Sequence, residues 1–233
     1  MSHDCGNMNK FVRNVKRLDY RDLVIFLIPF AIFMYYLYVF DPGILTYDSF
    51  DQLSQIAYHR FGSWHPFFHT FIEMVCLKIY PDPKSVCVLQ IFTFSTIWMI
   101  ICKYNRNDDV KTKSFILQVI ITLIISLIPI NAIYSITLWK DILFSYFVLF
   151  SCFLIQVLLD KKGNVSYLFI AVLSIALAFV CQLRPNGFII ILILLIALAV
   201  YFFKKNRDKK LHITIPALTI IFHPGDCFTE CCL

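Results

Sequence analysis

The chain has 233 residues, of which 59% are apolar or aromatic and only 15% are charged. Soluble domains contain roughly 45–50% apolar and about 25% charged residues, so this composition excludes a soluble globular enzyme, a disordered protein and a nucleic-acid binder. The net charge of +6 is interpreted by position, because Lys and Arg in the loops orient a membrane protein. The composition predicts an all-α polytopic membrane protein, since helices satisfy their own backbone groups in lipid.

The sequence contains nine cysteines, which is enough for a disulfide scaffold. Five of them lie in apolar runs, where a free thiol packs as a small hydrophobic side chain. We therefore expect these five to be free thiols: Cys76, Cys87, Cys102, Cys152 and Cys181.

Several apolar runs are long enough to cross a bilayer, which takes about 20 helical residues. A further run at 67–80 is short and contains Glu73 and Lys78, so we expect a re-entrant or juxtamembrane helix there. The predicted spans are 23–40, 85–102, 114–130, 142–159, 166–183 and 188–203.

Basic residues predict the orientation of these spans. They cluster before the first span and after the second, fourth and sixth spans. If 67–80 does not cross, these clusters place 16 of the 21 Lys and Arg residues on one side, which the positive-inside rule makes cytoplasmic. We therefore expect 1–22 to be a basic cytoplasmic segment and 23–205 to be the transmembrane domain.

The last segment, 206–233, contains an apolar run that is too short to span and ends in a cysteine-rich stretch. The spacing of Cys227, Cys231 and Cys232 does not match an ordinary zinc site. We interpret this segment as the truncated or frame-shifted end of a longer protein.

The predicted outer loops are 41–84, 131–141 and 184–187, and they contain most of the unusual polar residues of the chain. In the first of them, Asp48 or Ser49 is suited to cap a helix, since a short oxygen side chain binds the free amides of a first turn. The helix after it has an apolar stripe at helical spacing, which predicts an amphipathic helix on the membrane surface. The stripe consists of Phe50, Leu53, Ile56 and Ala57.

Asp48 has two interpretations: it is a helix cap and nothing more, or it is a carboxylate held at the lipid–water boundary beside a reaction. Asp51 lies about one helical turn away, and the sequence leaves open which carboxylate faces a substrate. Further along the loop, His65 and His69 are four residues apart and share a helical face. With Asp48 they make an incomplete metal site, and a structural pair of interfacial histidines is the alternative.

The other outer loops contain cations at the ends of predicted spans. Lys140 and Asp141 form either a simple ion pair or an ammonium placed near a membrane-level anion. Arg184 precedes a Pro-Asn-Gly turn that contains Asn186. Its guanidinium either extends to the interface, as long cationic side chains do, or binds a lipid phosphate with two hydrogen bonds.

The order of these motifs resembles that of bacterial polytopic glycosyltransferases of the GT-C fold and a related uncharacterised membrane family. More distantly, it is similar to protein mannosyltransferases and aminoarabinose transferases. The resemblance covers about residues 20–205 and is carried by Asp48-Ser-x-x-Gln52, His65-Pro66, Lys140-Asp141 and Arg184-Pro-Asn-Gly187.

The resemblance implies a GT-C-like bundle that transfers a sugar from a polyprenyl-phosphate donor to an acceptor on the outer face. Asp48 matches the family's acidic residue and is the expected general base, with Asp51 as the alternative carboxylate. We infer that Lys140 and Arg184 bind the donor phosphate. We further infer that Gln52, His65 and Asn186 orient substrate.

Members of these families have longer chains, so we interpret this chain as an N-terminal part. The sequence does not decide whether a divalent cation serves as a cofactor. The alternative functions are a membrane transporter and a non-catalytic membrane protein fragment. Transporters have ionisable residues in the middle of spans, whereas here the polar residues gather at one side.

Overall fold

The computed structural model describes residues 18–62, 66–106, 111–161, 165–184 and 186–204. In this part of the chain the secondary structure is helical, apart from one isolated bridge between Ile44 and Thr137. The all-α prediction is therefore confirmed. The helices are α2 (Tyr20–Val39), α3 (Tyr47–Tyr58), α4 (Phe67–Ile79), α5 (Lys84–Tyr104), α6 (Lys111–Leu127), α7 (Pro129–Ser135), α8 (Lys140–Asp160), α9 (Tyr167–Leu183) and α10 (Gly187–Lys204).

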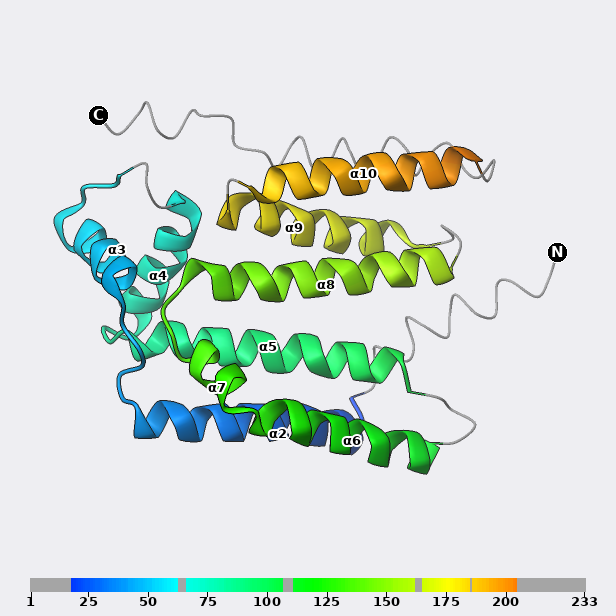
Figure 1. The fold of residues 1–233 in the computed structure, drawn as a ribbon, viewed down its shortest axis with the longest axis horizontal. Helices are drawn as coiled ribbons and strands as arrows, with labels where there is room; N and C mark the ends of the chain where they lie inside the picture. The colour runs from blue at the N-terminus through cyan, green and yellow to red at the C-terminus, as the bar shows by residue number, and fades with distance from the viewer. Residues whose placement is uncertain (1–17, 63–65, 107–110, 162–164, 185, 205–233) are drawn as a thin grey trace.

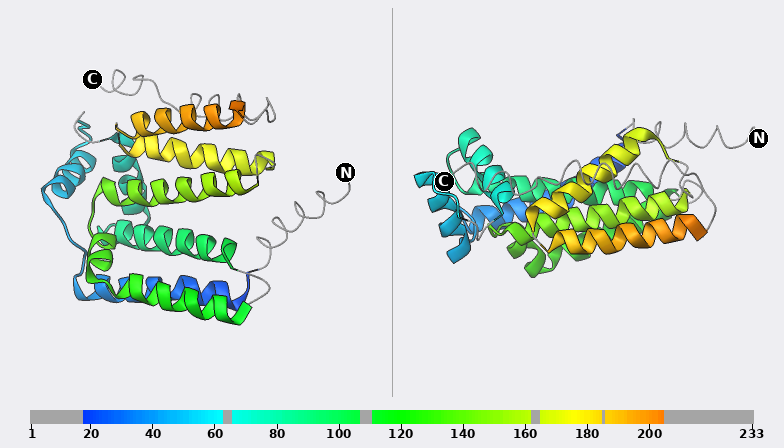
Figure 2. Two further views of the ribbon diagram at one scale, coloured as in Figure 1. Left: turned by 45° about the vertical axis from the view of Figure 1, so that its right-hand side comes forward. Right: turned by 90° about the horizontal axis from the view of Figure 1, so that it is seen from above.

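The long helices lie side by side in one bundle (Figure 1). α6 packs on α2, α2 on α5, α5 on α8, α8 on α9, and α9 on α10. The short helices α3, α4 and α7 lie together at one end, as both further views show (Figure 2). We call this the α3 end, and it also contains the start of α8 and the turn between α9 and α10.

Each of the six predicted spans overlaps one long helix, namely α2, α5, α6, α8, α9 or α10. Among the described helices, α2, α5 and α8 are long and apolar enough to cross a membrane, and α6 with α7 adds a fourth if the bent pair is one span. α9 is apolar but has only 17 residues. These helices indicate a membrane protein.

The predicted span 114–130 is wrong as a continuous helix. α6 ends at Leu127, and α7 starts at Pro129 with its axis turned by 70°. Proline lacks a backbone N–H and disfavours the helical conformation of the residue before it, so Ile128 becomes extended and Pro129 starts a new helix. The bend directs the chain across the α3 end toward α8.

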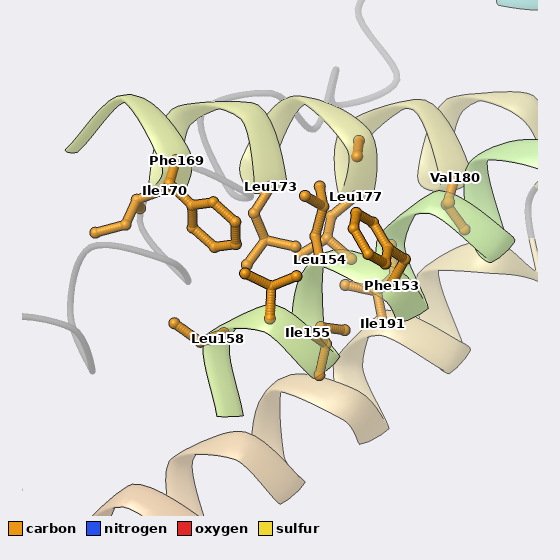
Figure 3. Close-up of a cluster of buried hydrophobic side chains, with 12 residues drawn as sticks. Phe153, Leu154, Ile155, Leu158, Phe169, Ile170, Leu173, Leu177, Val180 and Ile191 are labelled. Carbon is orange, nitrogen blue, oxygen red and sulfur yellow. The ribbon is translucent and has the colours of Figure 1, made fainter. Parts of the chain in front are cut away.

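Two apolar clusters hold the bundle together. One lies between α8, α9 and α10, where Phe153, Leu173 and Ile191 pack with their neighbours (Figure 3). The other joins α2, α5 and α7 around Phe33 and Ile91. The five cysteines that the sequence places in apolar runs are free thiols, as predicted.

The apolar run at 67–80 forms the 13-residue helix α4 at the α3 end, which is too short to cross a membrane. It packs against α3, α5 and α9. Predictions for most of the basic segment 1–22 and for 206–233 fall on residues 1–17 and 205–233, which lie outside the described residues.

Candidate functional site

The first turn of α3 is attached to the segment that leads into α8. The backbone N–H of Ile44 donates to the Ile136 carbonyl at 2.9 Å, and the Ser49 hydroxyl donates to the Leu138 carbonyl at 2.8 Å. The indole N–H of Trp139 donates to Thr46 Oγ1 at 2.7 Å. These bonds join parts of the chain about 90 residues apart and bring the start of α3 next to the start of α8.

The predicted cap of α3 is wrong by two or three residues. The N-cap residue is Thr46, which is extended, and its backbone N–H donates to the Ser49 hydroxyl at 3.0 Å. Ser49 is thus the third helical residue and closes a capping box, while Asp48 lies inside the first turn. The interpretation of Asp48 as a helix cap and nothing more is therefore excluded.

The two candidate carboxylates of α3 differ in their surroundings. Asp48 is exposed, and its carboxylate accepts no hydrogen bond from any residue that the structure describes. Asp51 is half-buried and accepts a hydrogen bond from the Gln55 amide at 2.9 Å. Of the two, Asp48 is the carboxylate that presents its oxygens to solvent.

The cation-bearing segments meet at the same end of the bundle. Lys140 is the first residue of α8 and is half-buried. Arg184, at the end of α9, forms an ion pair with Asp141 at 3.3 Å, with its guanidinium over the Phe144 ring. Asp141, which the sequence analysis offered as an ion-pair partner of Lys140, pairs with Arg184 in the structure.

The remaining predicted site residues have different environments. Asn186 is exposed in the tight turn where the Gly187 N–H donates to the Arg184 carbonyl at 2.9 Å. A side chain at Gly187 would collide with the Val180 backbone, which explains why glycine stands there. His65 lies outside the described residues.

Gln52 is buried within the fold, with only 1% of its surface exposed. Its amide nitrogen lies 3.0 Å from His69 Nδ1 and donates to Thr70 Oγ1 at 3.3 Å. His69 Nδ1 is also 3.6 Å from Glu73 Oε1, and neither side chain is exposed to solvent. The amide of Gln52 therefore connects α3 to α4, and the role inferred for it from the sequence, orienting a substrate, stays a prediction.

Sequence reasoning missed this cluster as a unit. It noted Glu73 only as a charge that argues against a span, and His69 only with His65. The signal was present, because His69 and Glu73 are four residues apart and face the same side of a helix. A polar pair on an otherwise apolar helix must find its partners inside the protein.

Burial controls the protonation of Glu73. It raises the pKa of Glu73 from the ordinary value of 4.5 to about 8, so this carboxyl group is mostly protonated at neutral pH. Burial, with Glu73 nearby, also raises the pKa of Cys76. In the described residues no three His, Cys, Asp or Glu side chains gather closely enough to hold a metal ion.

No family model, no curated protein and no solved structure matches this chain. The geometry of the α3 end and the chemistry of its side chains are therefore the basis for the functional proposal.

Proposed function

We propose that this chain is a membrane glycosyltransferase that moves a sugar from a polyprenyl-phosphate donor to an acceptor, with Asp48 as the general base. The observation that carries the proposal is the position of Asp48. Its carboxylate is exposed and unbonded within the described residues, on a turn attached beside Lys140 and at the same end as Arg184. We assign the α3 end to the outer side of the membrane and the N-terminus to the cytoplasm.

The reaction is a single displacement. The acceptor hydroxyl gives its proton to Asp48 while its oxygen forms a bond to the anomeric carbon. The bond from that carbon to the phosphate oxygen breaks, the oxygen keeps the electron pair, and the configuration is inverted. Because the lipid phosphate is already a good leaving group, the second carboxylic acid that glycosidases use is not needed.

Arg184 and Lys140 are the groups proposed to stabilise the departing phosphate. Arg184 uses Nη1 for its ion pair with Asp141, and the partners of that pair are 43% and 41% exposed. An exposed pair contributes little stability, so a phosphate can compete for the guanidinium. Lys140, at the start of the neighbouring helix, adds a second cation.

The test is consumption of a radiolabelled polyprenyl-phosphate hexose or pentose by the purified chain in proteoliposomes supplied with cell-envelope acceptors. Asp48→Asn should lower turnover by about 10²–10⁴-fold, the usual contribution of a general base. Asp41→Asn is the matched control, because Asp41 is an exposed carboxylate of the same loop that pairs with Lys84. It should leave turnover unchanged.

Arg184→Gln should raise the KM for the donor about tenfold or more, as expected when a charge-assisted hydrogen bond is lost. If Asp48→Asn keeps the turnover of the unmodified chain, the base assignment is wrong. If the unmodified chain consumes none of these donors, the enzyme proposal fails, and a transporter or a non-catalytic protein becomes the better explanation.

A further inference from the structure

The contact between α3 and α4 is polar, although both helices lie in an apolar protein. α3 directs Ser49, Gln52 and Gln55 inward, while aromatic residues of the same helix, such as Phe50 at 59% exposed, point outward. The buried residues of α4 are His69, Thr70 and Glu73. Hydrogen bonds, rather than apolar packing, therefore hold α3 in place.

One nitrogen atom lies at the centre of this contact. His69 Nδ1 is 3.0 Å from the Gln52 amide nitrogen of α3 and 3.6 Å from Glu73 Oε1 on its own helix. An amide nitrogen has only protons to give, so in this arrangement Nδ1 is the acceptor. An ionised Glu73 has only lone pairs to offer, so it requires a proton on the same Nδ1. Gln52 therefore requires His69 Nδ1 without a proton, whereas an ionised Glu73 requires it with one.

No other described neighbour of Glu73 offers its carboxylate a cation or a hydrogen-bond donor in place of His69. Besides His69, the titratable groups of the described residues that interact with it electrostatically include Cys76 of α4 and Cys87 of α5. α3 contributes the uncharged Gln52 amide, and the contact of α9 with α4 includes the packing of Phe179 on Phe68. Within the described residues, both Glu73 oxygens lack a hydrogen-bond donor.

We propose that Glu73 and His69 form a buried proton switch that controls whether α3 packs on α4. Because Asp48 lies in the first turn of α3, the switch also controls the position of Asp48. With a proton on Glu73, His69 accepts from Gln52 and α3 is held on α4. When Glu73 loses its proton to water, the neutral His69 ring changes tautomer: its Nε2 proton leaves and Nδ1 takes one up, so the net release is the one proton of Glu73. His69 then donates from Nδ1 to the carboxylate, Gln52 loses His69 as an acceptor, and α3 opens so that water reaches Glu73. The proposed control of α3 packing rests on these contacts alone, whereas any effect on catalysis also rests on the proposed function.

The direction of the pH dependence follows from the burial of Glu73. Its pKa is about 8 when α3 packs on α4, and it returns toward 4.5 when α3 opens and water enters. Opening therefore releases a proton between these two values and becomes about tenfold more favourable for each pH unit. Above about pH 8 both states are ionised, and the opening equilibrium levels off.

The test is hydrogen–deuterium exchange of the α3 backbone in nanodiscs from pH 5.5 to 9.5, corrected for the intrinsic pH dependence of exchange. Protection of α3 should fall about tenfold per pH unit up to about pH 8 and then become constant. Glu73→Gln, which keeps the shape but cannot ionise, should make the profile flat. Asp160→Asn, the same kind of change in an exposed residue of α8, should keep the profile of the unmodified chain.

If Glu73→Gln does not fold, a second variant, Gln52→Leu, tests the same contact from α3. Gln52→Leu cannot donate to His69, so it should expose α3 at every pH while the other helices stay protected. A pH-independent α3 in the unmodified chain, or an unchanged slope in Glu73→Gln, overturns the proposal.

The exchange measurement needs no substrate, so it is independent of the glycosyltransferase proposal. Asp48→Asn should be inactive and yet keep the pH dependence of α3. If the chain transfers sugar, its turnover should decline with rising pH as α3 opens, and Glu73→Gln should reduce that decline. A switch without transfer activity would refute the proposed function and leave the switch intact.

Discussion

Asp22 joins three parts of the bundle at the end opposite α3. It lies in the first turn of α2 with 1% of its surface exposed. Lys103 Nζ and Arg106 Nη1 each lie 2.9 Å from one of its carboxylate oxygens. Arg106 also donates through Nε to Gln118 of α6 at 3.2 Å. One carboxylate thus links α2 to the end of α5 and, through Arg106, to α6.

Asp22→Asn should destabilise the protein by about 3 kcal/mol. Breaking a buried ion pair costs about 3–5 kcal/mol because the remaining charge lacks a partner. Lys103 and Arg106 keep 18% and 10% of their side-chain exposure, so water partly compensates and the low end of that range applies. Asp19→Asn is the control at the N-cap of the same helix, because Asp19 is 49% exposed and 3.8 Å from Arg21, and asparagine caps a helix as well as aspartate does. It should cost about 0–1 kcal/mol.

The assay is reversible unfolding in mixed micelles, followed by tryptophan fluorescence at neutral pH. A double variant, Asp22→Asn with Lys103→Met, should recover part of the loss because it removes one uncompensated cation while keeping the bulk of the side chain. If Asp22→Asn and Asp19→Asn differ by less than about 1 kcal/mol, the buried pairing has no energetic importance, and the argument from burial is refuted.

Two further predictions concern overall stability. Because the pKa of Glu73 is about 8 in the fold against an ordinary 4.5, unfolding releases a proton between these values, and stability should fall by about 3 kcal/mol from pH 6 to pH 9. Denaturation at each pH should show little of this slope in Glu73→Gln; an equal slope in both would contradict the assignment. Gly187→Ala should cost about 1–3 kcal/mol, since its methyl group would collide with the Val180 carbonyl and a backbone collision is not easily relieved. Gly62→Ala, whose methyl group would meet only the flexible Gln55 side chain at 3.7 Å, should change the melting temperature little, and equal losses in the two would count against the steric argument.

The positions of the long helices could be predicted from the sequence because each is an uninterrupted apolar run. The predicted ends of α5 differ by one or two residues from the observed Lys84–Tyr104. The prediction that the unusual polar residues gather at one end also follows from the sequence, since every second loop between antiparallel spans lies at the same end. The break after Leu127 was missed because the apolar pattern continues past Pro129, although the proline itself is a signal for it.

The pairings within the α3 end could not be predicted. The apolar stripe of α3 suggested which residues lie along one face, but not which face meets the protein. In a membrane protein, apolar side chains are stable against lipid, so Phe50 points outward and Gln52 points inward. The pairing of Arg184 with Asp141 depends on how α9 packs against α8, which sequence spacing does not encode.

The ion pairs at the two ends of the bundle differ in burial and therefore in how easily they exchange partners. Asp22 is almost fully buried between its cations, so an incoming anion cannot replace it without exposing the pair. The Arg184–Asp141 pair is more than 40% exposed on both sides, and such a pair is weak. Under the proposed function, the phosphate that gains charge as it departs can therefore compete with Asp141 for Arg184 without disturbing the bundle. The α3 end thus has a cation, Arg184, whose ion pair is open to exchange, which the proposed phosphate binding requires, while Lys103 and Arg106 at the opposite end are fixed by the fold.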